Sequence, residues 1–203
     1  MLNAGQWVFK NRGWLPLPIL ALAIFFPEYN PSKINFILGA ILILAGEAGR
    51  LWAVGYAGGI TRTRTGDLND LVVTGPFAYV RNPIYISNIV MYSGATLILG
   101  VPGLLPLTVL YFFIEYSLII LYEESILAKA FSKRYVDYKK MVNRWLPNLK
   151  FKNKASVSKT KASSSQNRFS LNEYMVAEKS TFRFMAGIVI IAIAKYYIIG
   201  LFG

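Results

Sequence analysis

The side chains able to do chemistry in this chain are mainly arginines and glutamates, because the sequence contains neither histidine nor cysteine. The lack of histidine removes the commonest metal ligand and the commonest general base near neutral pH. The lack of cysteine removes thiol nucleophiles and disulfide bonds. A Ser-His-Asp hydrolase and a histidine-based zinc enzyme are therefore excluded, and we expect no metal site.

Four arginines flank the expected pocket. Arg62, Arg64 and Arg81 lie in the polar segment between two apolar blocks, and Arg50 lies within the block before this segment. The planar guanidinium binds a carboxylate or a phosphate at two points, so these residues are candidates for holding an anionic substrate. The alternative is that they only anchor the segment to anionic lipid headgroups. Arg50 also follows Glu47 at a helical spacing of three, and an ion pair that only packs the helix is the alternative for this residue.

An ordered set of motifs includes the last of these arginines. It begins with Gly75-Pro76-Phe77 and Arg81-Asn82-Pro83-Ile84-Tyr85, and after a long apolar stretch it continues with Glu123-Glu124. It then includes Phe131, Tyr135, Tyr138 and Trp145-Leu146-Pro147. In order and spacing this set resembles the isoprenylcysteine carboxyl methyltransferase family and its relatives among the phospholipid methyltransferases, over about residues 40–150.

The resemblance implies an enzyme that uses S-adenosylmethionine (SAM) to methylate a lipid or a lipidated acceptor. By position, it implies these cofactor contacts: Asn69, Asp70, Leu71, Val72, Phe77, Asn82, Pro83, Ile84, Tyr85 and Glu123. A carboxylate such as that of Glu123 suits the ammonium of the methionine portion. Aromatic faces such as that of Tyr85 can attract the sulfonium. For the glutamate pair alone, a solvated helix end is the alternative.

Three positions depart from the family pattern. Asn82 stands where the family has histidine, so any role that needs an imidazole is lost, although an amide can still form hydrogen bonds. Phe77 supplies no hydroxyl at the aromatic position after Gly-Pro. Ile119 stands where the isoprenylcysteine enzymes carry a substrate-binding arginine, one helical turn before the glutamate pair, which argues against a prenylcysteine acceptor.

The expected methyl acceptor is an anionic oxygen, either a carboxylate or a phosphate, on a membrane lipid. Such an oxygen needs no deprotonation, whereas a protonated amine needs a base, and this chain has no histidine to act as one. The four arginines would hold the anion. The alternatives are a phospholipid N-methyltransferase, a sterol-reductase-like enzyme that uses NADPH, and a non-catalytic membrane scaffold.

The elements that must position these residues are membrane helices. Five apolar blocks reach or approach the roughly 20 residues that span a bilayer. They are residues 14–26, 34–56, 84–101, 104–122 and 184–202, and the Pro-Gly turn at 102–103 predicts that the third and fourth form an antiparallel hairpin. A signal peptide is the alternative for the first block, but no small-residue cleavage pattern follows it. The predicted fold class is all-α, a polytopic transmembrane protein with about five spans.

Residues 123–142 keep apolar side chains at helical spacing between lysines, which predicts an amphipathic helix on the cytoplasmic membrane surface. Packing against the protein core is the alternative. Residues 151–172 are rich in lysine and serine, a composition typical of a linker. The predicted organisation is a methyltransferase core at residues 1–150, this linker, and a C-terminal segment at 173–203 that contains the fifth span.

The formal net charge of +12 would suit a nucleic-acid partner in a soluble protein. Here the basic residues lie between apolar blocks, and lysine and arginine accumulate in the cytoplasmic loops of membrane proteins. We therefore expect the lipid bilayer and a lipid acceptor as partners, and no nucleic acid. The same rule predicts a cytoplasmic N-terminus, and the resemblance implies an active site on the cytoplasmic side. We expect the membrane to be the cytoplasmic membrane of a bacterium or an archaeon.

Overall fold

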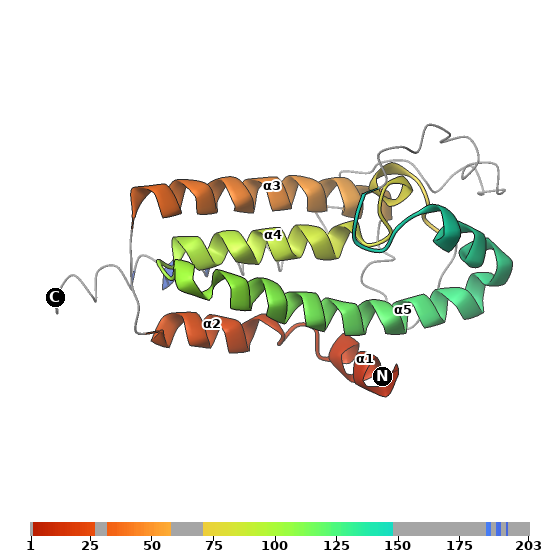
Figure 1. Ribbon diagram of the computed structural model, residues 1–203, viewed down its shortest axis with the longest axis horizontal. Coiled ribbons are helices and arrows are strands. Elements are labelled where there is room, and N and C mark those ends of the chain that lie inside the picture. Colours follow the sequence, from red (N-terminus) through yellow and green to blue (C-terminus); the bar gives the residue numbers. More distant parts are fainter. Residues whose placement is uncertain are drawn as a thin grey trace.

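The computed structural model describes residues 2–26, 32–57 and 71–147, together with residues 186, 187, 190, 191 and 194. In the first three ranges the chain forms helices and no strands, in agreement with the predicted fold class. The α-helices are α1 (Leu2–Lys10), α2 (Pro16–Phe25), α3 (Lys33–Ala57), α4 (Pro83–Ile98) and α5 (Leu105–Met141), with the short 3-10 helices η2 (Gly75–Ala78) and η3 (Pro102–Leu104). Figure 1 shows α2, α3, α4 and most of α5 running along the long axis of the molecule.

Helices α3 and α4 pack closely because small residues face each other between them. A Cβ atom at Gly39 would lie only 2.7 Å from the carbonyl oxygen of Gly94. A Cβ atom at Gly46 would lie 2.8 Å from the carbonyl oxygen of Ser87. Small residues let two backbones approach in this way, which is the usual basis of helix association in membranes.

Helices α4 and α5 form the antiparallel hairpin predicted from the Pro-Gly turn (Figure 1). Near the turn, the hydroxyl oxygens of Thr96 and Thr108 lie 3.1 Å apart. Further from the turn, the rings of Tyr92 and Phe112 stack with their centroids 4.1 Å apart. Gly100 helps to reverse the chain with a φ of 74°, a conformation that glycine adopts without steric cost.

The amphipathic segment predicted to begin at Glu123 is a continuation of α5 and not a separate element. No glycine or proline lies between Pro106 and Pro147, so nothing in the sequence interrupts the helix at the glutamates. The helix bends at Ser132 instead, where φ is 44° and ψ is −118°. Figure 1 shows the end of α5 turning back at this bend.

The part of α5 beyond the bend packs against the core. Tyr135 and Tyr138 are buried in one cluster with Leu71 and Val73, which precede η2. These contacts favour packing of the segment against the protein core over a position on the membrane surface.

The first apolar block forms α2, which has 10 residues and is therefore about 15 Å long, too short to span a bilayer alone. Helix α1, which the sequence analysis does not predict, precedes it and packs against α5. A Cβ atom at Gly5 would lie 2.4 Å from the carbonyl oxygen of Leu118 on α5. The link between α1 and α2 is held to α5 as well, because the Tyr111 hydroxyl donates to the carbonyl of Leu15 at 2.9 Å.

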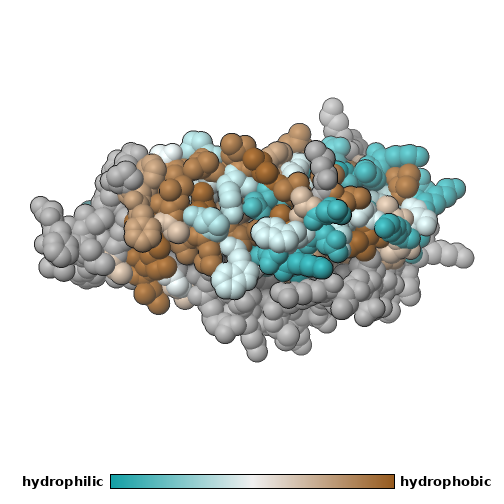
Figure 2. Space-filling model, turned by 90° about the horizontal axis from the view of Figure 1, so that it is seen from below, coloured by the Kyte–Doolittle hydropathy of each residue, from teal (hydrophilic) through white to brown (hydrophobic). Residues whose placement is uncertain are grey.

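Large apolar side chains are exposed along α3 and the first half of α5. They include Ile34, Phe36, Ile37, Ile41 and Leu44 on α3, and Leu107, Leu110, Phe113 and Ile114 on α5. On the face shown in Figure 2, hydrophobic surface gathers toward one end of the coloured part and hydrophilic surface toward the other. Among the described residues, two helical stretches are long and apolar enough to cross a membrane by length and composition, Lys33–Ala57 and Pro102–Met141.

The number of spans stays a prediction. Helices α2 and α4 are apolar but shorter than the two long stretches. Most of the predicted fifth span at 184–202 lies outside the described residues, and the predicted linker at 151–172 lies wholly outside them.

Candidate active site

The candidate active site lies where α4 begins, beside the middle of α5. Pro83 occupies the first turn of α4, a position where its missing N–H costs no helical hydrogen bond. Tyr85, two residues later, donates its hydroxyl to Oε1 of Glu123 at 2.9 Å. Its ring centroid also lies 4.8 Å from that of Tyr116 on α5. Two motifs that are 38 residues apart in the chain thus meet through one hydrogen bond.

A second polar contact set links α3 to the same two helices. Arg50 Nη1 on α3 donates to Oδ1 of Asn88 on α4. The amide of Asn88 donates in turn to the Tyr116 hydroxyl at 3.3 Å. Because the Tyr116 ring also contacts Tyr85, these contacts lead from Arg50 to the tyrosine that binds Glu123.

Glu124 is the centre of a cluster of charged side chains. Arg144 binds it with two hydrogen bonds, from Nε to Oε1 at 3.1 Å and from Nη2 to Oε2 at 2.7 Å. Arg81 Nη2 lies 3.3 Å from Oε1, and Lys139 Nζ lies 3.4 Å from Oε2. The hydrogen bond with Glu124 raises the pKa of the Arg144 guanidinium, so this cation stays charged at any physiological pH. The side chains of Arg81 and Glu124 are only 9% and 8% exposed, so this pair is largely withdrawn from water.

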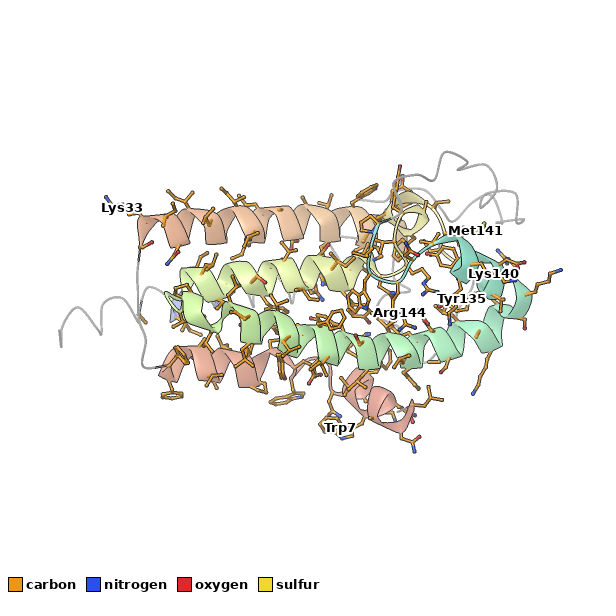
Figure 3. All side chains as sticks on the ribbon, viewed as in Figure 1. Trp7, Lys33, Tyr135, Lys140, Met141 and Arg144 are labelled. Atoms are coloured by element: carbon orange, nitrogen blue, oxygen red, sulfur yellow. The ribbon has the colours of Figure 1, made fainter. Side chains whose placement is uncertain are left out.

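The segment after α5 is joined to the start of α4 by hydrogen bonds to its backbone carbonyls. The side-chain amide of Asn82 donates to the carbonyl of Arg144 at 3.2 Å, and the backbone N–H of Arg81 donates to the carbonyl of Asn143 at 2.9 Å. The Tyr138 hydroxyl donates to the carbonyl of Phe77 at 2.7 Å. Figure 3 shows Arg144 and Tyr135 at this end of the molecule and Lys33 at the opposite end.

The described residues bring only part of the predicted cofactor set together. Tyr85 and Glu123 are in contact. Leu71 lies in the buried cluster beyond the bend of α5, and Ile84 packs against Val54 of α3. Asn69 and Asp70 lie outside the described residues, as do Arg62 and Arg64 from the predicted anion-binding set.

Several residues near the site were missed by the sequence analysis: Asn88, Tyr116, Lys139 and Arg144, together with the separate role of Glu124. Asn88 and Tyr116 could have been found from helical spacing. Asn88 lies three residues after Tyr85 and Tyr116 lies seven residues before Glu123, so each shares a helix face with a motif residue. Arg144 and Lys139 could not have been found in this way, because the bend at Ser132 brings them back to Glu124. Within the described ranges, no three acidic or other metal-ligating side chains form a group that could hold a metal ion.

Comparisons with known proteins agree on one class of enzyme. The family model described as phospholipid methyltransferase matches residues 34–134. A protein-S-isoprenylcysteine O-methyltransferase from Saccharomyces cerevisiae is 27% identical over 157 residues, an alignment that covers 72% of this chain and 66% of the yeast protein. The chain therefore spans slightly less than two thirds of that relative. No solved structure gives a significant match.

Proposed function

We propose that this chain, a member of the family whose model is described as phospholipid methyltransferase, is a SAM-dependent integral membrane methyltransferase. The methyl group goes to a carboxylate or phosphate oxygen of a lipid or a lipidated acceptor. The observation that carries the proposal is the contact between Tyr85 and Glu123, which joins the two halves of the motif set at the hydrophilic end of the helices.

The residues around this contact fit the cofactor. Glu123 offers a carboxylate with one oxygen bound to a tyrosine hydroxyl, which leaves further acceptor capacity for an ammonium. Tyr85 and Tyr116 place aromatic faces beside it, which suit a sulfonium or an adenine ring. Phe77, the Asn82–Tyr85 turn and residues 69–72 would complete the nucleoside pocket. The bound cofactor would supply an electrophilic methyl group on a positively charged sulfur.

The acceptor side of the proposal rests on the arginines. A carboxylate or phosphate oxygen forms the new bond to the methyl carbon as the carbon–sulfur bond breaks, and the neutral thioether leaves, so no base is needed. Arg81 keeps Nε and Nη1 buried and without a hydrogen-bond partner among the described residues, and these N–H groups suit an anion. Arg50 lies on α3 beside α4, and Arg62 and Arg64 complete the proposed set. The protein's task is to align acceptor and methyl donor in a pocket that excludes water.

The acceptor is a lipid other than prenylcysteine. Ile119 stands where isoprenylcysteine enzymes have their substrate-binding arginine. Its side chain is fully buried in a core cluster with Phe112 and Ile120. It presents no charge to a carboxylate. The arginines at the ends of α3 and α4 would take over that task.

The experiment is to incubate membranes that contain the protein with methyl-labelled SAM and to identify the labelled lipid by mass spectrometry. An O-methyl ester of a carboxylate or phosphate, absent with the Glu123→Gln variant, is the expected product. The competing outcome is an N-methylated phospholipid headgroup, which would overturn the anionic acceptor. No labelled lipid, combined with protection from thermal unfolding by NADPH and not by SAM, would favour the reductase.

A further inference from the structure

Helix α1 packs against the turn of α5 that ends in Glu123. A Cβ atom at Gly5 would lie 3.1 Å from Cβ of Tyr122, so the two helices are in close contact. The ring of Phe9 lies with its centroid 5.5 Å from that of Tyr122, and Phe9 is buried. Figure 1 shows α1 lying against the middle of α5. The N-terminal helix therefore forms one side of the region around Glu123.

Arg12 is the cation that this packing brings to the site. It follows α1 by two residues, and its Cζ lies 4.6 Å from the centroid of the Phe9 ring, a distance typical of a cation–π contact. The Phe9 ring in turn contacts Tyr122, the residue before Glu123, so the guanidinium lies near the turn of α5 that carries this carboxylate. Arg12 lies outside residues 34–134, the part of the chain that the family model covers.

The amino-acid end of SAM carries one negative and one positive charge on adjacent groups. A charge that leaves water for a partly buried site costs free energy unless it meets an opposite charge there. Glu123 can serve the ammonium, but it repels the neighbouring α-carboxylate, which needs a cation of its own. An arginine suits a carboxylate because its N–H groups bind both oxygens.

We propose that Arg12 binds the α-carboxylate of SAM while Glu123 binds the ammonium, so that α1 closes the amino-acid end of the cofactor site. This rests on the proposed function, since it presupposes that SAM is the methyl donor. It assigns a binding role to a residue just after α1, before the motif region begins.

The test measures binding of three ligands to the purified full-length protein in detergent by calorimetry. The ligands are SAM, decarboxylated SAM, which keeps the amine but lacks the carboxylate, and 5′-methylthioadenosine, which lacks both charged groups. Arg12→Gln should weaken SAM binding by roughly 10- to 150-fold, the range for a lost charged hydrogen bond. It should leave binding of the other two ligands unchanged. Lys10→Gln, a change to an exposed cation at the end of α1, should alter none of the three.

Other variants separate the proposal from a structural role. Glu123→Gln should weaken both SAM and decarboxylated SAM, because both carry the amine. Arg12→Lys keeps the charge without the fork and should lose less SAM affinity than Arg12→Gln. Equal weakening of SAM and decarboxylated SAM by Arg12→Gln, or no weakening of either, would overturn the role of Arg12. Failure of the unaltered protein to bind any of the three ligands would instead overturn the proposed function itself.

Discussion

Glu123 and Glu124 are neighbours in the chain, yet they have different partners. Successive residues of an α-helix point about 100° apart, so two adjacent side chains on α5 meet different surroundings. Glu123 faces the start of α4 and accepts one hydrogen bond from Tyr85. Glu124 faces three cations, from the segment before α4, from the end of α5 and from the residues after it. We therefore assign ligand binding to the first glutamate and stabilisation of the fold to the second.

For Glu123 we expect a loss of binding with little loss of stability. Glu123→Gln keeps the shape of the side chain and can still accept a hydrogen bond from Tyr85, but it removes the negative charge. Affinity for SAM should fall by roughly 10- to 150-fold, because a hydrogen bond to a charged group is worth about 1.5–3 kcal/mol. Calorimetric titration measures the affinity. Unchanged SAM binding would remove Glu123 from the site.

For Glu124 the expected result is the reverse. Glu124→Gln leaves Arg81 largely buried without its anion, and the loss of one partner from a buried ion pair costs on the order of 3 kcal/mol. The midpoint of thermal unfolding in detergent should therefore fall by several degrees. Asp137→Asn, which removes a carboxylate from a more exposed pair with Lys140, is the matched control and should change the midpoint little. Equal shifts for the two variants would contradict the assignment.

At the scale of elements, the contact between α3 and α4 depends on residues without side chains. A methyl group at Gly39 would lie 2.7 Å from a backbone oxygen of Gly94 and 2.8 Å from Cγ1 of Ile98, so the helices must move apart to accept it. Gly39→Ala should therefore destabilise the protein by about 1–3 kcal/mol, the usual cost of overpacking. Gly13→Ala is the matched control, since nothing lies within 4 Å of the new methyl group. Thermal unfolding of both variants in detergent measures the difference.

Long apolar elements and the turn between two of them were predictable from sequence. The helix at 34–56 and the hairpin at 84–122 correspond to α3, α4 and the first half of α5, because block length and a Pro-Gly turn determine them locally. Helix α1 was not predicted, since its nine residues are too few and too polar to form one of the long apolar blocks on which the prediction of helices relied. The bend at Ser132 was not predicted either, because a positive φ usually needs glycine and the sequence there gives no such sign.

One part of the candidate site was likewise predictable from sequence, and another part was not. The pairing of Tyr85 with Glu123 follows from motif order, since both lie in segments whose helices were predicted. The cluster around Glu124 depends on the bend, which brings Lys139 and Arg144 back beside a residue they follow by 15 and 20 positions. Local sequence patterns do not show that residues so far along the chain come back into contact with Glu124.

At the scale of the whole molecule, the described helices have one apolar end and one charged end. Lys33 lies at the start of α3 and Lys140 near the end of α5, at opposite ends of the molecule (Figure 3). The chain has no cysteine, so a single introduced cysteine reports one position. In oriented membranes, Lys140→Cys should react with an impermeant thiol reagent only from the cytoplasmic face, and Lys33→Cys only from the opposite face. Reaction of both from one face would contradict the predicted topology.

The length of α5 before the bend at Ser132 also bears on the depth in the bilayer at which the proposed methyl transfer would take place. From Leu105 to Glu123 the helix rises about 27 Å, close to the roughly 30 Å hydrocarbon thickness of an ordinary bilayer. If Leu105 lies at one boundary of the hydrocarbon, we predict that Glu123 lies near the other, where acyl chains end and headgroups begin. A thicker bilayer would draw this carboxylate into the hydrocarbon, and a thinner one would leave it above the headgroups, unless the helices tilt. The turnover rate in vesicles should then pass through a maximum as acyl-chain length is varied, which makes membrane thickness a physical control on the reaction.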